Sequence, residues 1–353
     1  MKTFELPISA NYINHWGLQE AVRELLQNAI DATSAFTFEI IGSTLIISNE
    51  ESKLTASDLV LGTSSKQDDK ASIGKFGEGF KLALAVLARE NREIIVNNNG
   101  KTWIPEYRLS EQFNCDILHI DEHEMSQPEP GLHFVLRNLT DDELNLVRRN
   151  CLHMQPHYPE HLSTKYGNII LSHKVAKLFV NGLFVTDTDL KYTYDMKPEY
   201  LSLERDRQTV SDFDLQWLTS KMWADRPDEA DKVADAVAAN VKDVSYLANQ
   251  VNKTATVIDT VHDNFVATYG TNARPASDQR EADYINSNGG RAAVVSTNHR
   301  TMVMASPKYN PPELRRAPAK VEELQEFFSR NKKYMRRPAI VACKKLIAKW
   351  SEI

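Results

Sequence analysis

The stretch Glu24-Leu25-Leu26-Gln27-Asn28-Ala29-Ile30-Asp31-Ala32 decides how the N-terminal part of the chain is read. It lies within an apolar pattern of three- and four-residue spacing from Trp16 to Ala35, which predicts an amphipathic helix. Glu24 and Asn28 are one turn apart and share a helix face. A carboxylate there can orient or deprotonate water, and an amide oxygen beside it can ligate Mg²⁺. Taken alone, this composition is more typical of an ordinary structural helix.

Two further segments downstream strengthen the case for a phosphate site. Gly74, Gly77 and Gly79 run directly into a predicted helix from Phe80 to about Arg89. Glycines let backbone N–H groups approach phosphate oxygens, and the N-terminus of a helix attracts anions. Just upstream, the segment Leu61-Gly62-Thr63-Ser64-Ser65-Lys66 offers hydroxyls and an ammonium, although a capped turn would use the same residues.

In this order and spacing, the three segments resemble the GHKL (Bergerat-fold) ATPases. That family includes gyrase-type topoisomerases, ninety-kilodalton heat-shock chaperones, MutL-type mismatch-repair proteins and MORC proteins. The resemblance implies ATP and Mg²⁺ as cofactors, Glu24 as the general base for water attack and Asn28 as the metal ligand. The nucleotide-binding residues that it implies are Asn28, Asp31, Ala32, Asn49, Ser64, Ser65, Lys66, Gly74, Lys75, Phe76, Gly77, Glu78, Gly79, Phe80 and Lys81.

The sequence departs from the family pattern at the position that contacts adenine. The family has Asp-x-Gly-x-Gly there, whereas this chain has Asn49 in the Asp position and lacks both glycines. An Asn oxygen can still accept a hydrogen bond from an adenine amino group, but it loses charge assistance worth ~1–2 kcal/mol. Leu132 also replaces the usual Thr of a Gly-Thr strand, after Gly131.

A second block of strands is predicted from residue 163 onward, at 168–171, 176–180 and 183–185. Asn181-Gly182 predicts a hairpin between the last two. The resemblance continues more loosely here, over 165–225, and implies a transducer-like domain. Arg205 or Arg207 would then stabilise charge in the transition state, and a surface helix-capping cluster is the alternative.

Composition and charge limit the class of protein. The 353 residues are 42% hydrophobic and 25% charged, as in folded globular chains. The strongly apolar run Leu82–Ala88 is far shorter than the ~18 residues of a membrane span. No secretory signal is recognised, and three scattered cysteines do not form a disulfide framework. These features favour a cytoplasmic protein. The family resemblance implies a bacterial cell or a phage-infected host, because compact stand-alone members of that family occur in bacteria and their phages.

The C-terminal segment is basic within an acidic chain. Residues 315–353 carry a net charge of +7 although the whole chain carries −6. Such a tail can bind nucleic acid or an acidic protein, and a solvated helical face is the alternative.

Four further residues are candidate metal ligands, and a solvated loop is the alternative reading of the same stretch. They are Cys151, His153, His157 and His161.

The sequence therefore predicts an α+β protein in three parts. A Bergerat-type sandwich (1–160), with a mixed sheet and helices on one face, precedes a transducer-like α/β domain (161–225). A helical and small α/β module with the basic tail (226–353) completes it. The expected function is Mg²⁺-dependent ATP binding and slow hydrolysis as a conformational switch, with a homodimer implied by the resemblance. The alternative is a non-hydrolysing scaffold that binds protein or DNA.

Overall fold

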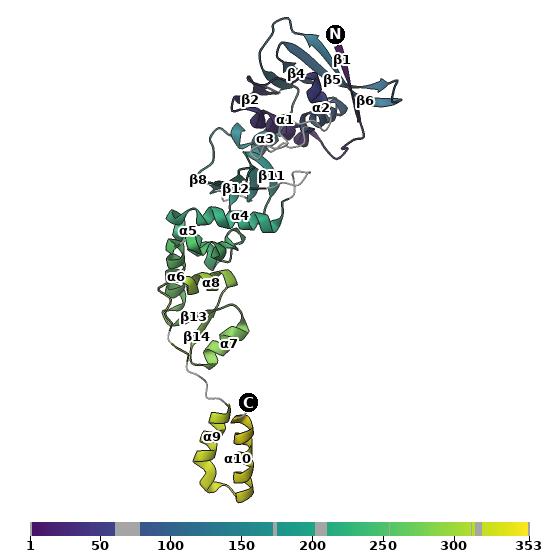
Figure 1. The fold of residues 1–353 in the computed structure, drawn as a ribbon. Helices are drawn as coiled ribbons and strands as arrows, with labels where there is room; N and C mark the ends of the chain where they lie inside the picture. Colours follow the sequence, from purple (N-terminus) through teal and green to yellow (C-terminus); the bar gives the residue numbers. More distant parts are fainter. Residues whose placement is uncertain are drawn as a thin grey trace. The chain divides into compact units, whose positions relative to one another are not determined.

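The computed structural model describes residues 2–60, 78–171, 175–201, 210–253, 255–311, 313–314 and 320–351 (Figure 1). The chain forms two compact units, Met1–Arg226 and Pro227–Ile353. Both contain helices and strands, which confirms the α+β class. The predicted residues that lie outside the described ranges are Ser64, Ser65, Lys66, Gly74, Lys75, Phe76, Gly77, Arg205 and Arg207.

A seven-stranded sheet forms the first part of unit 1. Its spatial order is β1-β6-β5-β4-β7-β3-β2. The strands are β1 (Lys2–Ser9), β2 (Phe36–Ile41), β3 (Thr44–Asn49), β4 (Ile94–Asn98), β5 (Lys101–Ser110), β6 (Cys115–Glu124) and β7 (Leu132–Leu136). Every pair of neighbours is antiparallel, so the mixed sheet expected here was wrong. Short hairpins join β2 to β3, β4 to β5 and β5 to β6, and a hairpin imposes antiparallel pairing.

Two helices, α1 (Leu18–Ala32) and α2 (Gly79–Arg89), pack on this sheet and on each other. Ile47, Phe134, Val96 and Trp103 are paired across four adjacent strands and are all buried. They share one core with Leu25 of α1 and with buried side chains of α2. The apolar spacing of α1 therefore positions Glu24, and the sheet holds α2 beside it.

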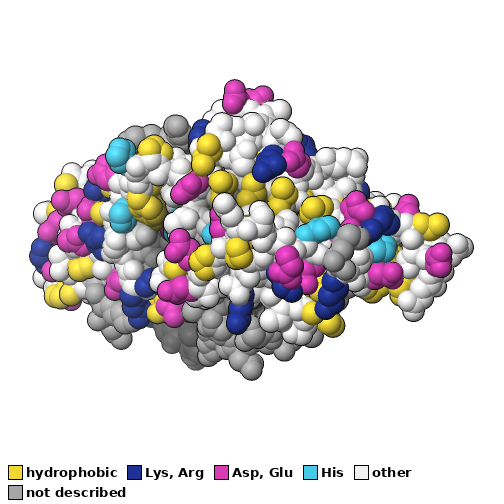
Figure 2. Space-filling view, turned by 90° about the horizontal axis from the view of Figure 1, so that it is seen from above, with side chains coloured by type: hydrophobic (Ala, Val, Ile, Leu, Met, Phe, Trp, Pro, Cys, Tyr) yellow, Lys and Arg dark blue, Asp and Glu magenta, His cyan; other side chains and the backbone are white. Residues whose placement is uncertain are grey.

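Figure 2 shows a face on which side chains of both charge signs are interspersed with hydrophobic ones. The ion pairs of the sheet agree with this mixture. Lys101 Nζ lies 2.8 Å from Glu122 Oε1, and Arg108 Nη2 lies 2.8 Å from Asp121 Oδ1. Such half-exposed pairs contribute at most about 1 kcal/mol each.

The rest of unit 1 contains a five-stranded sheet of order β11-β10-β12-β9-β8. Its strands are β8 (His161–Thr164), β9 (Gly167–Ile170), β10 (Lys177–Val180), β11 (Leu183–Asp187) and β12 (Thr193–Met196). The hairpin predicted at Asn181-Gly182 is confirmed, and both residues have positive φ, 50° and 79°. Helix α3 (Asp141–Asn150) precedes this sheet in the sequence, and α4 (Asp212–Ala224) follows it. Unit 1 also contains the 3₁₀ turns η1 (Ala56–Leu59) and η2 (Leu152–Met154).

Unit 2 begins with the helices α5 (Ala230–Ala238) and α6 (Ala255–Tyr269). A parallel pair of strands, β13 (Ala273–Ala276) and β14 (Arg291–Val294), encloses α7 (Gln279–Ser287) in the sequence. Met302–Met304, an apolar run that predicts a short strand when read alone, lies instead in α8 (Thr297–Ala305), whose N-cap Ser296 accepts a hydrogen bond from His299 N.

The last two helices are α9 (Lys320–Asn331) and α10 (Arg337–Ser351), which contact each other. Tyr334, in the turn between them, is 76% exposed. Across the described ranges, no helix combines the length and the hydropathy needed to cross a bilayer.

Candidate functional site

Helix α1 carries the first candidate side chains, and its N-cap residue is Gly17. Gly17 N donates to Glu20 Oε2 at 2.9 Å, which fixes the first turn. Buried apolar side chains along the helix, including Ala21, Leu25 and Ala29, hold it against the core. Glu24 is fully buried in this register, and Asn28 is half-buried one turn later.

Glu24, Asn28 and Gly79 meet where α2 begins beside α1. The Asn28 Nδ2 group donates to the Glu24 carbonyl oxygen at 2.6 Å. Gly79 lies so close to Glu24 that a Cβ on Gly79 would overlap the Glu24 Oε2 atom, and it would lie 3.6 Å from Asn28 Nδ2. The structure thus brings Gly79 against two side chains that lie 51 and 55 residues before it in the sequence.

Arg23 is a neighbour of the buried carboxylate that the sequence reading missed. Its Nη2 atom lies 3.5 Å from Glu24 Oε1, and its side chain is 16% exposed. A buried carboxylate is costly without a charged or hydrogen-bonding neighbour, so this contact offsets part of the burial of Glu24. Adjacency in the sequence does not predict this contact, because side chains one residue apart on a helix do not face each other.

Asn49 ties the end of β3 to the end of α1. Its Nδ2 atom donates to Ala29 O at 3.1 Å, and its Oδ1 atom accepts from Thr33 Oγ1 at 3.1 Å and Glu51 N at 3.3 Å. Gly131 closes over the same place with φ +85°, where a Cβ would meet Glu50 Cα at 2.6 Å. The amide therefore holds the C-terminal end of α1 through bonds that a carboxylate could make only in part.

Lys81 is fully buried in the first turn of α2, and its Nζ atom donates to Val60 O at 2.5 Å. Burial lowers the pKa of the Lys81 ammonium, whereas Asp58 and Glu78 act in the opposite direction. The Lys81 ammonium therefore lies beside Val60, which directly precedes the predicted phosphate-binding segment Leu61–Lys66 in the sequence.

The other described candidates lie close to this group in the chain. Glu78 is the half-buried N-cap residue of α2, and Phe80 follows Gly79 as a buried side chain. Asp31 and Ala32, both half-buried, form the last residues of α1. They lie on the helix end that Asn49 ties down.

The cysteine and histidine cluster has other partners. Burial raises the pKa of the Cys151 thiol to about 12. His153 Nε2 donates to Asn181 O at 3.0 Å, and His161 Nδ1 donates to Pro159 O at 2.8 Å. Within the part of the chain that the structure describes, no three His, Cys, Asp or Glu side chains are grouped to hold a metal ion.

Comparisons with known proteins give limited similarity. A scan against models of known protein families found no match. An uncharacterized protein of Mycoplasma pneumoniae is 27% identical over 213 residues, which cover 56% of this chain and 86% of that protein. The ATPase region of Saccharomyces cerevisiae topoisomerase II is a structural match at a TM-score of 0.33 and 14% identity, over 48% of this chain and 62% of that one.

Proposed function

We propose that residues 1–160 form a GHKL-type (Bergerat-fold) module that binds ATP with Mg²⁺ and hydrolyses it slowly as a conformational switch. The observation that carries the proposal is the meeting of Glu24, Asn28 and Gly79. A buried carboxylate, an amide and a helix N-terminus that accepts only glycine converge at one point. Burying a carboxylate costs free energy, and a role in activating water gives a reason for that cost.

The donor set fits a magnesium nucleotide. The amide oxygen of Asn28 is a hard ligand of the kind that Mg²⁺ prefers. The start of α2 at Gly79 offers backbone N–H groups and a favourable dipole to phosphate oxygens. Lys81 is the cation of the same turn. When bound, Mg²⁺-ATP supplies the phosphoanhydride bond to be cleaved and a metal ion that offsets the phosphate charge.

Glu24 would then hold the attacking water and accept its proton, the role of a general base. Arg23 and Gly79 position this carboxylate, the first through its guanidinium at 3.5 Å and the second by close packing. Ser64, Ser65, Lys66 and the glycine-rich residues Gly74–Gly77 would close over the phosphates. Arg205 or Arg207 would stabilise the charge that develops during transfer.

Selection of the nucleobase would depend on Asn49. Its Oδ1 atom already accepts two hydrogen bonds from the protein, so a contact with an adenine amino group requires the Thr33 hydroxyl or the Glu51 N–H to give way. We therefore expect weaker discrimination between ATP and GTP than a carboxylate at this position would give. Direct binding of both nucleotides by calorimetry tests this point.

The decisive experiment is ATP turnover with Mg²⁺, measured beside direct nucleotide binding. Glu24→Gln removes the general base and should lower ATP turnover by about 100-fold or more while ATP binding persists. Asn28→Ala removes the proposed metal ligand and should weaken the dependence of ATP turnover on Mg²⁺. Glu39→Gln, on an exposed position of β2, is the matched control. If folded wild-type protein neither binds nor hydrolyses ATP, the proposal is wrong.

A second candidate function is a non-hydrolysing scaffold, and the bonds of Asn49 favour it because they occupy the acceptor expected to face adenine. Binding without turnover, unchanged by Glu24→Gln, would support the scaffold. In either case a homodimer is a proposed state, and sedimentation with and without ATP tests whether nucleotide drives it.

The basic tail provides a proposed contact with a nucleic-acid or protein partner. Lys332, Lys333, Arg336 and Arg337 surround the exposed Tyr334 between α9 and α10. Phosphate contacts of this kind weaken steeply as salt rises. Retention on DNA that is salt-dependent and lost on deleting residues 315–353 supports the nucleic-acid partner, and no DNA binding at low salt excludes it.

A further inference from the structure

Helices α9 and α10 form a hairpin in unit 2 and are joined by the five residues 332–336 (Figure 1). A connection this short makes the two helices antiparallel neighbours. Each residue from 321 to 350 is half-buried or exposed, and none of them is buried. A helix buries its apolar stripe against neighbouring elements, and a chain of fewer than ~40 residues rarely buries enough surface to be stable without a partner. The hairpin therefore has apolar surface that the contact between its two helices does not cover.

The uncovered apolar side chains lie on one side of the hairpin. Phe327 follows the half-buried Leu324 by three residues and is 53% exposed. Leu346 follows the half-buried Cys343 by three residues and is 38% exposed, and Trp350, one turn later, is 39% exposed. A step of three residues turns the side chain by about 60° around the helix axis, and in an antiparallel pair this rotation leads to the same side from both helices. Phe327, Leu346 and Trp350 together are called the apolar face below.

Charges of opposite sign border the apolar face. Glu323 borders it on α9 and Lys349 borders it on α10, and both side chains are exposed. Within the described ranges, neither of them has an ion-pair partner. The whole helices are divided in the same way, because α9 has three glutamates and two cations whereas α10 has four cations and no acid. A fitting partner therefore presents a basic border to α9 and an acidic border to α10, which a uniformly anionic surface does not.

We propose that this partner is a second copy of the chain, bound hairpin to hairpin through the apolar face. A two-fold axis parallel to the helices places α9 of one copy over α10 of the other, so that the two hairpins form a four-helix bundle. Glu323 of each copy then faces the partner's Lys349, and the apolar faces are buried between the copies. This association requires no nucleotide, so it does not rest on the proposed ATPase function.

The first test follows the mass of the full chain without nucleotide, by sedimentation equilibrium over about a 100-fold range of concentration. The mass should rise from 40.1 kDa toward twice that value. Leu346→Glu buries an unpaired charge in the apolar face and should weaken association by about 10-fold or more. Val341→Glu is the matched control, because Val341 is also an exposed aliphatic residue of α10, at 49%, and lies about 140° away from Leu346 around the helix. A wild-type chain that stays monomeric at every concentration overturns the proposal.

Charge reversal then tests which helix meets which. Glu323→Lys and Lys349→Glu should each weaken self-association by about fivefold or more, because each creates two pairs of like charge in the dimer. A mixture of the two variants restores both pairs of opposite charge, so mixed dimers should form with the wild-type affinity. Both positions are exposed, and circular dichroism verifies that each variant keeps its helices. No recovery in the mixture overturns the arrangement of α9 over α10. Association that appears only after ATP is added overturns the hairpin contact and leaves the ATPase proposal standing.

Discussion

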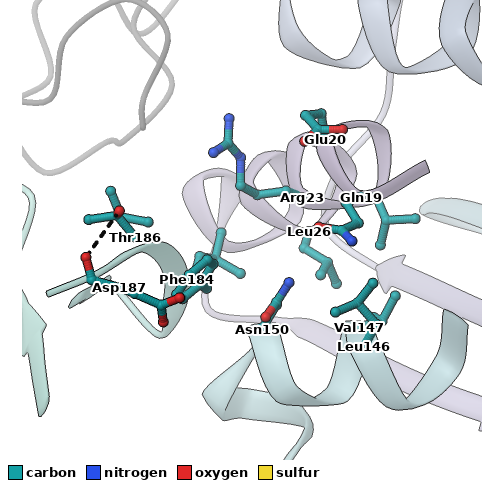
Figure 3. Close-up of a pocket in the computed structure, with 13 residues that line it drawn as sticks. Gln19, Glu20, Arg23, Leu26, Leu146, Val147, Asn150, Phe184, Thr186 and Asp187 are labelled. Carbon is teal, nitrogen blue, oxygen red and sulfur yellow. Dashed lines mark hydrogen bonds between the residues drawn. The ribbon is translucent and has the colours of Figure 1, made fainter. Parts of the chain in front are cut away.

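Helix α1 has two faces that are packed in opposite ways. On the face toward α2, Glu24 and Gly79 lie so close that a single methyl group would not fit between them. On the face toward α3 and β11, the same helix borders about 550 Å³ of open space. Close packing fixes the position of a side chain, whereas open space lets a ligand or a new side chain enter. The first face therefore fixes the position of Glu24, and the second leaves space beside the helix (Figure 3).

The largest expected effect is on stability, at two adjacent leucines of which one lies on each face. Leu25 is fully buried in the main core, and Leu26 is 3% exposed and lines the cavity. Leu25→Ala should lower the free energy of unfolding by about 4 kcal/mol and Leu26→Ala by about 2 kcal/mol, because truncation beside an existing cavity removes fewer contacts. Urea denaturation measures both values. Equal losses would mean that the two faces are packed alike.

Gly79→Ala tests the dense face directly. The added methyl group overlaps the Glu24 carboxylate, so we expect a loss of about 2 kcal/mol in stability and a fall of about 100-fold in ATP turnover. Gly17→Ala is the matched control, because a Cβ there has its nearest neighbour at 3.5 Å and φ is −125°. Turnover and stability that both match the wild type would show that the contact does not constrain Glu24.

Asn49→Asp introduces the Asp that the resembling family has at this position, which contacts the C-terminal end of α1. The carboxylate cannot donate to Ala29 O, and it places a negative charge at the C-terminal end of α1. We expect a loss of about 1–2 kcal/mol in the free energy of unfolding. Asn97→Asp on β4 is the control, because the Asn97 side chain accepts a bond from Thr102 Oγ1. A variant as stable as the wild type would remove the structural role assigned to this amide.

Local patterns predicted the parts of the fold that depend on local chemistry. The spacing of Val22, Leu25 and Leu26 indicated α1, and Asn181-Gly182 indicated the β10–β11 hairpin. The sequence reading did not assign β1, although Phe4, Leu6 and Ile8 alternate along it, because Pro7 is disfavoured inside a strand and the partner strand β6 is more than 100 residues away. Ser296 was the unused signal for α8, whose Met302–Met304 resembles a strand when read alone.

The same distinction applies to the candidate site. Helix periodicity places Glu24 and Asn28 on one face, and the family resemblance adds the glycine-rich segment. The close approach of Gly79 to Glu24 depends on how α1 and α2 pack, which no local pattern encodes. The bonds of Asn49 to Ala29 and Thr33 likewise require β3 to lie against the end of α1.

The smallest expected effect is the pH dependence that Lys81 brings to the α2 side of the comparison. Burial lowers its pKa in the folded state below the ordinary 10.5, so the unfolded chain binds more protons between the folded-state value and 10.5. Stability contributed by this group therefore rises with pH through that window, and below it the cost of burying the ammonium is fully present. Lys81→Met removes the titrating group, and the alkaline rise should flatten by less than about 1 kcal/mol. Thermal unfolding between pH 7 and 10.5 measures the difference, with the exposed Lys232→Met as control. Identical pH profiles for Lys81→Met and wild type would mean that the ammonium is as well solvated in the folded protein as in the unfolded chain. The close packing between α1 and α2 would then extend to Gly79 but not to Lys81.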